Sequence, residues 1–428
     1  MDARVRFSPS YYPAVEAGLV RSGLLDAAEY VLCVIAIFLC SMVHFRFADL
    51  NFTISDGLFA FCAIAAIAAG GLSFQPFPRP AVLFWMGGLF LMVTGLSTSG
   101  MLSADPMRGM IVVAQYAFAF VVVPLVFFGR TFEQVVRLAK VYVYSAVAIS
   151  LHGIYLIHVD GQRFTVFVTG SGRLAGLMER TNECATVLAL SVPIVLLLAT
   201  IGSMRKLLAW LLIGVIAYGV LLTGSNTGLL SLVYGLGVFA ILGAPWRRLL
   251  VPLSIVAIML PLFGGWIGDY LPDAFQKRVL TALETGDISQ AGTFDGRVDL
   301  IYEAVAMTDR TALIGIGPDQ YRVQSEMRAP VHNVYLLLWT EGGILSLIGF
   351  ILILLGAIGC ALTSLFDRIN RAFAAAIFAN VTMFMFAANA LPHVYSRFWV
   401  VPIVLPMALA CYGAIRDYGA DEGFEARS

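Results

Sequence analysis

Long apolar runs separated by short polar segments dominate this chain. Most of the runs are about 20 residues long, the length a helix needs to cross roughly 30 Å of hydrocarbon. They are apolar on all sides, whereas a surface helix of a soluble protein carries one apolar stripe. They also lack the alternation of barrel strands. The pattern predicts membrane-spanning helices, because an open sheet cannot satisfy its backbone groups in lipid.

About twelve spans are predicted from the runs. Their expected ranges are 29–47, 57–75, 81–99, 109–129, 134–157, 183–202, 206–223, 226–244, 249–268, 333–360, 371–391 and 398–415. The sequence shows neither an internal repeat nor a low-complexity tract, so residues 1–428 are expected to form a single polytopic membrane domain. The predicted fold class is therefore an all-α integral membrane protein.

One large polar loop, residues 269–332, separates the ninth expected span from the tenth. Its periodicity predicts two short helices near 272–284 and 295–308. Gly315, Gly317 and Pro318 are expected to break the chain after the second helix. This loop is long enough to hold the chemistry of the protein.

Every second connection between spans is short and basic. The basic residues of these connections are Arg79, Arg130, Arg137, Lys140, Arg205, Lys206, Arg247, Arg248, Arg368 and Arg371. The positive-inside rule places them in the cytoplasm. Both termini then follow as cytoplasmic tails, residues 1–28 and 416–428, and the first of these lacks the pattern of a signal peptide. The loops 158–182 and 269–332 are expected to face outward.

The composition supports this interpretation. Only 13% of the residues are charged and 60% are hydrophobic, whereas an average soluble domain is about 25% charged. All 6 cysteines fall in apolar runs, which indicates buried thiols and not a disulfide framework. The net charge of +0 gives no reason to expect a nucleic-acid partner. No nucleotide-binding or metal-binding motif occurs, so neither a cofactor nor a metal is expected.

His332 is the first candidate for catalysis, because it lies where the large loop enters the tenth span. A histidine at this boundary is expected to titrate near neutral pH and to exchange a proton with a substrate. The alternative is an interfacial histidine that only hydrogen-bonds a backbone carbonyl. His393 and Arg397, in the last outward loop, are further candidates for lining the same outer cavity.

Glu341 lies inside the tenth span and is followed by Gly342 and Gly343. A carboxylate in a spanning helix is costly and marks a functional candidate. In a continuous helix, Glu341 and His332 would lie on opposite faces, roughly 13 Å apart along the axis, so a direct dyad is not expected. Glu341 is instead expected to support the cavity wall or to pair with an arginine. The two glycines indicate close helix packing or a local break.

Several arginines are expected on the outward side, against the usual charge bias. They are Arg173, Arg180, Arg297, Arg322 and Arg328. A guanidinium fork matches phosphate oxygens and stays charged, so this set would suit a diphosphate group. The alternative is a set of loop arginines that pair with nearby carboxylates.

Four segments in chain order carry a family resemblance. They are Gly172-Arg173-Leu174-Ala175-Gly176 with Asn182 and Ala185; Leu222 to Leu230, reading LTGSNTGLL; Gly296-Arg297 with Ile301, Tyr302 and Ala304, running on to Gly315-Ile316-Gly317-Pro318; and His332-Asn333 with Tyr335, Leu336 and Thr340-Glu341-Gly342-Gly343. Together these segments resemble the motifs of bacterial O-antigen ligases and of O-antigen and exopolysaccharide polymerases, which are integral membrane glycosyltransferases.

The resemblance implies transfer of a glycan from an undecaprenyl diphosphate carrier to an acceptor sugar hydroxyl. The reaction would occur at the periplasmic face of the bacterial inner membrane, without a metal. The acceptor is lipid A–core in ligases and a carrier-linked glycan in polymerases, which build lipopolysaccharide and exopolysaccharide. By their motif positions, Arg173 and Arg297 would hold the diphosphate, and His332 would be the base or a phosphate contact. Further substrate-binding residues are expected at Arg180, Asn182, Asn226, Tyr321, Arg322, Arg328, Asn333 and Glu341.

This chain departs from the family pattern at three points. Asn226 stands where many members have arginine, Arg180-Thr181 stands where Asn-Pro is common, and Tyr302 replaces a frequent tryptophan. Arg180 is a candidate to compensate for the arginine absent at Asn226. The competing class is a transporter or lipid-carrier flippase without chemistry, which would place its ionisable groups near the middle of the membrane. The choice between ligase and polymerase stays open, as do protein partners.

Overall fold

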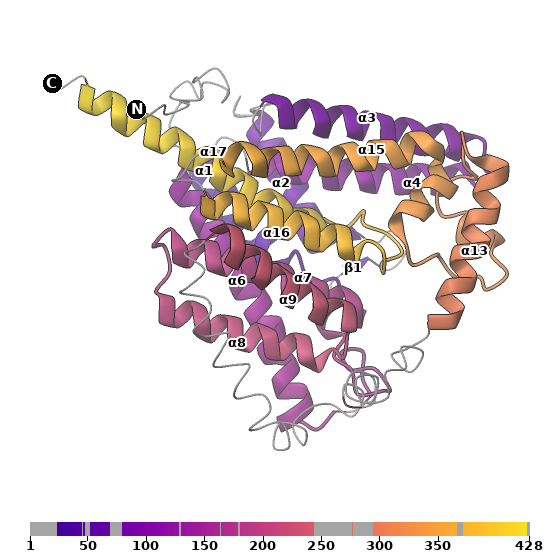
Figure 1. Ribbon diagram of the computed structural model, residues 1–428, viewed down its shortest axis with the longest axis horizontal. Coiled ribbons are helices and arrows are strands. Elements are labelled where there is room, and N and C mark those ends of the chain that lie inside the picture. Colours follow the sequence, from indigo (N-terminus) through magenta and orange to yellow (C-terminus); the bar gives the residue numbers. More distant parts are fainter. Residues whose placement is uncertain are drawn as a thin grey trace.

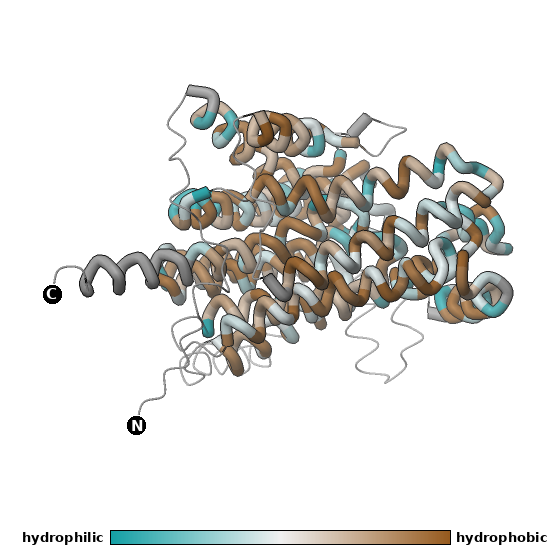
Figure 2. The backbone as a smooth tube through the Cα atoms, turned by 90° about the horizontal axis from the view of Figure 1, so that it is seen from above, coloured by the Kyte–Doolittle hydropathy of each residue, from teal (hydrophilic) through white to brown (hydrophobic). Residues whose placement is uncertain are grey.

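The computed structural model describes most of the chain. The described residues are 24–44, 46–47, 52–68, 79–127, 130–162, 164–178, 180–243, 276, 294–365 and 371–425. Within them the protein is mainly helical, with a short antiparallel pair of β1 (Arg46–Phe47) and β2 (Phe52–Thr53) and the loops that join the helices. Most helices run side by side along the long axis of the molecule, and hydrophobic residues predominate along them (Figures 1 and 2).

The helices follow the apolar runs closely. Their bounds are α1 Leu24–Leu39, α2 Ile54–Ala68, α3 Arg79–Met101, α4 Pro106–Ala117, η2 Phe118–Val122, α5 Val123–Val126, α6 Phe132–Ile154, η3 Tyr155–Val159, η4 Gly176–Met178, α7 Thr181–Thr200, α8 Lys206–Leu222, α9 Asn226–Gly243, α13 Phe294–Thr311, α14 Tyr321–Gln324, α15 Val334–Leu365, α16 Arg371–Ala387 and α17 Arg397–Glu425. The segments α4, η2 and α5 follow one another directly, as do α6 and η3.

Every expected span except 249–268 overlaps one of these helices. That span and the first expected loop helix, 272–284, lie outside the described residues apart from 276. Among the described residues, 6 helices are long and apolar enough to cross a membrane, and shorter apolar helices accompany them. The all-helical, multi-pass membrane fold is thus confirmed, while the number of about twelve spans stays a prediction.

Helix α7 is the central helix of the bundle. In its apolar window, 89% of the residues are buried, and it packs against α6, α8, α9, α16 and α17. A helix that is apolar on all sides reaches this degree of burial only when other helices surround it. Two expected site residues lie at the start of α7, Arg180 as its N-cap and Asn182 in its first turn.

Helices α3 and α15 approach each other closely at glycines. A Cβ atom on Gly349 would lie 2.3 Å from the carbonyl oxygen of Gly88, and one on Gly95 would lie 2.6 Å from that of Gly342. Ser346 Oγ adds a hydrogen bond to the carbonyl of Met92 at 3.1 Å. Small residues allow such contacts between helices in lipid. The close packing predicted from Gly342 is confirmed.

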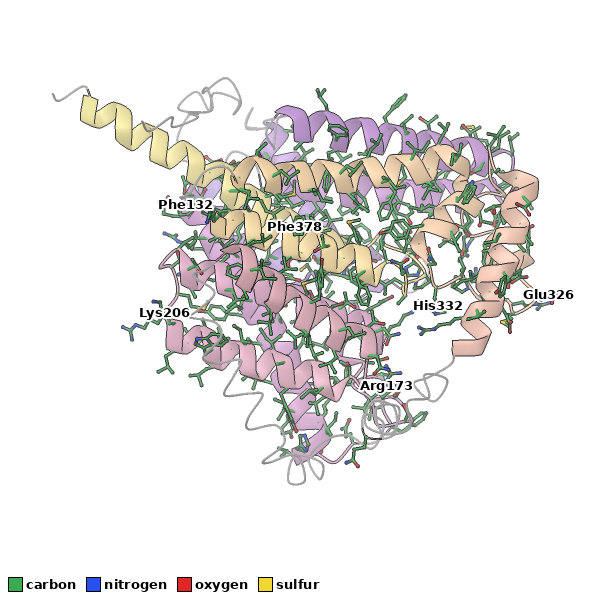
Figure 3. All side chains as sticks on the ribbon, viewed as in Figure 1. Phe132, Arg173, Lys206, Glu326, His332 and Phe378 are labelled. Carbon is green, nitrogen blue, oxygen red and sulfur yellow. The ribbon has the colours of Figure 1, made fainter. Side chains whose placement is uncertain are left out.

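The connecting segments gather at two opposite ends of the bundle. Phe132 and Lys206 lie at one end, and Arg173, His332 and Glu326 lie at the other (Figure 3). Helix α13 crosses this second end, whereas α17 ends on the opposite side (Figure 1). The loops that were expected to share the outward side therefore meet. Which end faces the cytoplasm stays a prediction.

Candidate active site

Helix α13 confirms the second predicted loop helix and is held against the start of α15 by a small apolar cluster. The cluster comprises Leu300, Ala304, Tyr321, Val331 and Leu337, all buried. Leu300 lies about one turn after Arg297 on the same helix, and Val331 immediately precedes His332. The cluster therefore fixes the two expected catalytic residues of the large loop relative to each other.

A break inside α15 gives this loop its shape. Gly343 has φ 69° and ψ −173°, which is not helical, and a Cβ atom there would lie 2.2 Å from the carbonyl oxygen of Leu313. The local break predicted from the glycine pair is thus confirmed. The loop backbone lies against the broken helix: Ile316 N–H donates to Thr340 O and Gly317 N–H to Glu341 O, both at 2.9 Å.

Glu341 supports this loop. It is 7% exposed, and its Oε1 accepts the backbone N–H of Tyr321 at 3.2 Å. Among the described residues it forms no ion pair with an arginine within 4.0 Å. Of the two expected roles, support of the wall fits this geometry and pairing with an arginine does not.

Tyr321 does not fit the substrate contact expected of it. Its side chain is 0% exposed, and its hydroxyl donates to Leu300 O at 2.8 Å and lies 3.1 Å from Glu303 Oε2. Burial, then the charge and the hydrogen bond of Glu303, raise the pKa of the Tyr321 hydroxyl above its ordinary value. The residue holds α14 onto α13.

Arg322 is engaged by Asp319, with Nε–Oδ1 at 3.1 Å and Nη2–Oδ2 at 2.9 Å. Asp319 also pairs with Arg108 at the start of α4. The alternative interpretation of a carboxylate-paired loop arginine therefore describes Arg322 better than a diphosphate contact does. Arg328 is exposed and has φ 50°.

His332 is partly buried beside two arginines from different parts of the chain. Its Nδ1 is buried without a hydrogen-bond partner among the described residues. Burial, then Arg297, then Arg180 lower the pKa of His332 to about 4, and the backbone of Pro330 acts in the opposite direction. The expectation of titration near neutral pH is wrong for the protein without substrate, because a proton on this imidazole would face two cations.

Arg173 lies in a second cluster, beside the turn between α8 and α9. Its Nε donates to Thr223 O at 2.8 Å and its Nη2 to Asn182 Oδ1 at 3.1 Å. Leu174 N–H donates to Leu222 O at 2.9 Å, which ties the loop to the same turn. Asn226 begins α9 directly after this turn. The structure therefore brings Arg173, Asn182 and Asn226 together.

Arg180 relates the group around Arg173 to the group of His332 and Arg297. It occupies the N-cap position of α7, two residues before Asn182, and its side chain is 51% exposed. Its Nη1 lies 3.7 Å from Glu183 Oε1. Its charge lowers the pKa of both His332 and His393. Arg180 thus adds a cation, at the positive end of a helix dipole, to the region between the clusters.

Asn333 has a structural role at the start of α15. Its Oδ1 accepts the N–H of Leu336 at 3.0 Å, as an N-cap residue does. Its Nδ2 donates to Asn389 Oδ1 at 3.3 Å, in the loop between α16 and α17. Both polar atoms of the side chain therefore help to hold the start of α15 in place.

The last loop contributes His393 and Tyr395 to the site, while Arg397 points elsewhere. Arg397 is buried and its Nη1 contacts Asp56 Oδ2 at 3.0 Å, so the expectation that it lines the cavity is wrong. Tyr395 lies within electrostatic reach of Asp319 and Arg180, and burial raises its pKa to about 12. Sequence reasoning missed Tyr395, because no spacing relates it to the other site residues.

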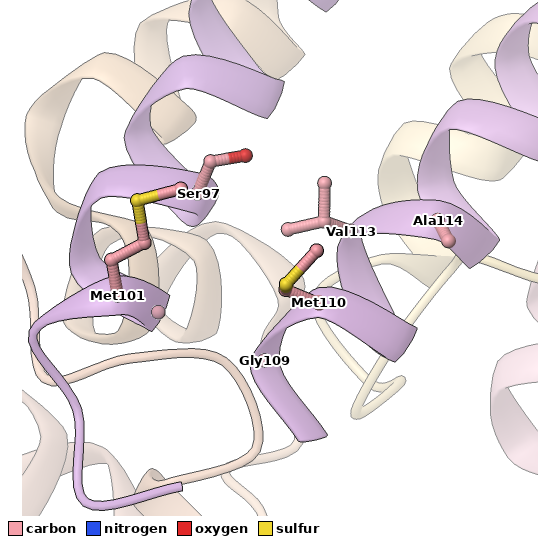
Figure 4. Close-up of a pocket in the computed structure, with 7 residues that line it drawn as sticks. Ser97, Met101, Gly109, Met110, Val113 and Ala114 are labelled. Atoms are coloured by element: carbon pink, nitrogen blue, oxygen red, sulfur yellow. The ribbon is translucent and has the colours of Figure 1, made fainter. Parts of the chain in front are cut away.

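Elsewhere the described residues offer little chemistry. No group of three or more His, Cys, Asp and Glu side chains that could hold a metal ion occurs there. An apolar pocket of about 200 Å³ lies between α3 and α4 (Figure 4). It is lined by Ser97, Gly100, Met101, Gly109, Met110, Val113 and Ala114. This lining holds no ionisable group, so the reacting atoms are better sought at the histidines and arginines.

Comparison with known proteins supports the resemblance read from the motifs. Residues 207–351 match the family described as O-Antigen ligase. The resemblance is thereby confirmed over this region, which includes Asn226, Arg297, His332 and Glu341. No curated protein matches the chain. The chain is also similar to a solved structure described as "Structural coordination of polymerization and crosslinking by a peptidoglycan synthase complex", with a TM-score of 0.41, 17% identity, and coverage of 79% of this chain and 98% of that chain.

Proposed function

We propose, from the premise that residues 207–351 match the O-antigen ligase family, that this protein is a metal-independent glycosyltransferase of the bacterial inner membrane. It would move a glycan from undecaprenyl diphosphate to an acceptor sugar hydroxyl at the periplasmic face. The observation that supports this most is that Arg297 and Arg180 both lie within electrostatic reach of the partly buried His332. These groups come from α13, the N-terminus of α7 and the loop before α15.

The two arginines suit a diphosphate. Guanidinium forks bind phosphate oxygens with two parallel hydrogen bonds and keep their charge at any relevant pH. Charge develops on the diphosphate as it leaves the sugar, so preorganised cations stabilise the transition state more than the ground state. Arg173 and Asn182 would contact the donor from the second cluster. The half-exposed side chain of Arg180 would take the place of the arginine that many family members have at the position of Asn226.

The lowered pKa of His332 fits a site that receives an anion. A diphosphate bound between Arg297 and Arg180 would offset their charges and raise the pKa of His332 toward its ordinary value. The imidazole would then bind a phosphate oxygen when protonated, or accept a proton when neutral. Both roles require the donor to be present.

The whole chain would act as one polytopic domain with both termini in the cytoplasm. Lys206, from one of the basic connections, lies at one end, and Arg173 and His332 lie at the other (Figure 3). With the positive-inside rule, this separation supports a periplasmic site. It also favours an enzyme over a flippase, because the ionisable site groups gather at an end and not in the middle of the spans.

The experiment uses purified protein in lipid nanodiscs with an undecaprenyl-diphosphate oligosaccharide, with and without a lipid A–core acceptor. Longer carrier-linked chains without lipid A would support a polymerase. Glycan found only on lipid A would support a ligase. If neither product forms and the carrier instead crosses a sealed bilayer containing the protein, the enzyme proposal is wrong and the flippase alternative holds.

A further inference from the structure

A second histidine enters the site from the loop between α16 and α17, residues 388–396. Val334 N–H donates to Ala388 O at 2.8 Å, which ties the start of this loop to the start of α15. The Asn333–Asn389 hydrogen bond adds to this connection. At the other end, the buried ion pair of Arg397 with Asp56 holds the first residue of α17. His393 lies between these two anchors.

The imidazole of His393 is placed by aromatic contacts. Its ring centroid lies 4.6 Å from that of Tyr395, and Tyr395 meets Tyr116 of α4 edge to face at 5.6 Å. The Nδ1 of His393 is buried and has no hydrogen-bond partner among the described residues. Buried polar atoms in folded proteins nearly always have a partner, so this nitrogen calls for an explanation such as a ligand.

The charged and titratable groups around His393 come from several elements. Arg180 at the start of α7, Asp319 before α14 and His332 before α15 all act electrostatically on it. Tyr395 lies beside it in its own loop. Arg297 is among the groups that act on His332, whereas Asp319 is among those that act on His393. Both imidazoles thus lie within electrostatic reach of Arg180, and their other charged neighbours differ.

The charged neighbours of each histidine affect how readily it takes up a proton. A proton on His332 would add a third positive charge beside Arg297 and Arg180, which favours contact with an anion. Burial, then Arg180, lower the pKa of His393 to about 4, while its own backbone and the carboxylate of Asp319 act in the opposite direction. A bound diphosphate would further offset Arg180. Asp319 is itself fixed, because it pairs with Arg108 and Arg322.

We infer that His393 binds the acceptor and takes the proton of its attacking hydroxyl, while His332 and the two arginines hold the donor diphosphate. The inference rests on the proposed function, and it assigns proton acceptance to His393 and donor binding to His332. The acceptor oxygen forms a bond to the anomeric carbon of the donor sugar, and its proton passes to a ring nitrogen of His393. The bond from that carbon to the phosphate oxygen breaks, and its electron pair leaves with the carrier diphosphate toward Arg180 and Arg297.

The test compares four variants in nanodiscs with the donor and acceptor that the wild type uses. His393→Phe keeps a ring against Tyr395 without a basic nitrogen, and is expected to lower kcat by about 10²–10⁴-fold with donor Kd changed less than about threefold. His393→Ala is expected to recover part of its activity with added imidazole, with a pH dependence that follows the ionisation of imidazole. His332→Gln should instead weaken donor binding. His158→Phe is the matched control, because the ring of His158 also lies against a tyrosine ring, that of Tyr218 with centroids 5.8 Å apart, and it should retain kcat.

Three outcomes separate the possibilities. Wild-type kcat in His393→Phe would overturn the inference and leave the proposed function standing. Loss of donor binding together with kcat in both His393 variants, without rescue by imidazole, would also overturn it, because the residue would then be structural. If the wild-type protein transfers no glycan from the carrier, the proposed function itself is wrong. The measurement on the wild type, without any variant, decides this.

Discussion

The carboxylate of Glu341 accepts the backbone N–H of Tyr321 at 3.2 Å, so an acidic side chain in a spanning helix serves to hold the loop that follows α13. The same helix turn binds the loop through its own carbonyls, since Gly317 N–H donates to Glu341 O and Ile316 N–H to Thr340 O. The site residues Arg297 and His332 lie on either side of this attachment in the chain. Their separation therefore depends on a contact that involves neither of them.

Replacing Glu341 tests this structural role. Glu341→Gln keeps an oxygen that can accept the N–H of Tyr321 and should retain most of the activity. Glu341→Ala leaves that buried N–H without its partner, at a cost of about 1–3 kcal/mol. The thermal unfolding temperature in detergent and the transfer rate should therefore fall together in Glu341→Ala. A Gln variant as inactive as the Ala variant, but with wild-type stability, would assign the carboxylate to the chemistry instead.

Gly343 allows the break in α15, because its φ of 69° is unfavourable for residues with a side chain. Gly343→Ala adds a Cβ atom 2.2 Å from Leu313 O, so the backbone must move. We expect a destabilisation of at least about 2 kcal/mol and a loss of transfer, measured by thermal unfolding and product formation. Gly359→Ala in the same helix is the matched control, because nothing lies within 4 Å of its added Cβ. Equal effects of the two changes would contradict a special role for the break.

The spans and the order of the site segments were predictable, whereas several individual roles were not. Runs near 181–200 or 226–243 are recognisable because length and apolarity alone define a membrane span. The role of Glu341 depends on Tyr321, 20 residues earlier, whose backbone reaches it only because Gly315, Gly317 and Gly343 bend the chain. The burial of Arg397 depends on its ion pair with Asp56, 341 residues away, and no local sequence pattern indicates that contact.

Arg297 and Arg322 are predicted to respond differently to the same substitution. Arg297→Lys replaces a planar fork by a point charge at the diphosphate and should lower kcat/KM by about 10²-fold or more. Arg322 is already engaged by Asp319, so Arg322→Lys keeps the ion pair and should change kcat/KM by less than about fivefold. Steady-state kinetics in nanodiscs measure both. Equal losses in the two variants would mean that Arg297 has no special contact with the donor.

His332→Ala is predicted to abolish transfer without removing the protein from the membrane. The side chain is only partly buried and its Nδ1 has no partner among the described residues, so little packing depends on it. Membrane levels and the unfolding temperature should match the wild type. His158→Ala is the control, because His158 is exposed and hydrogen-bonds Tyr218 at 2.7 Å, a contact separate from the arginines. Full transfer by His332→Ala would remove this histidine from the mechanism.

Donor binding is predicted to be coupled to protonation of His332. The pKa of His332 is about 4 in the empty site because of burial and of the two arginines. A diphosphate between Arg297 and Arg180 cancels part of that field and stabilises the imidazolium, so the pKa rises on binding. Because the complex then binds a proton more tightly than the free protein, donor affinity should increase as pH falls through the raised pKa toward about 4, and level off below it. Calorimetric titration with the donor in buffers of different ionisation enthalpy measures the proton taken up. His332→Gln should abolish the part of the proton uptake that belongs to His332 and leave the part that belongs to His393. An unchanged proton uptake in this variant would mean that another group, and not His332, takes up the proton.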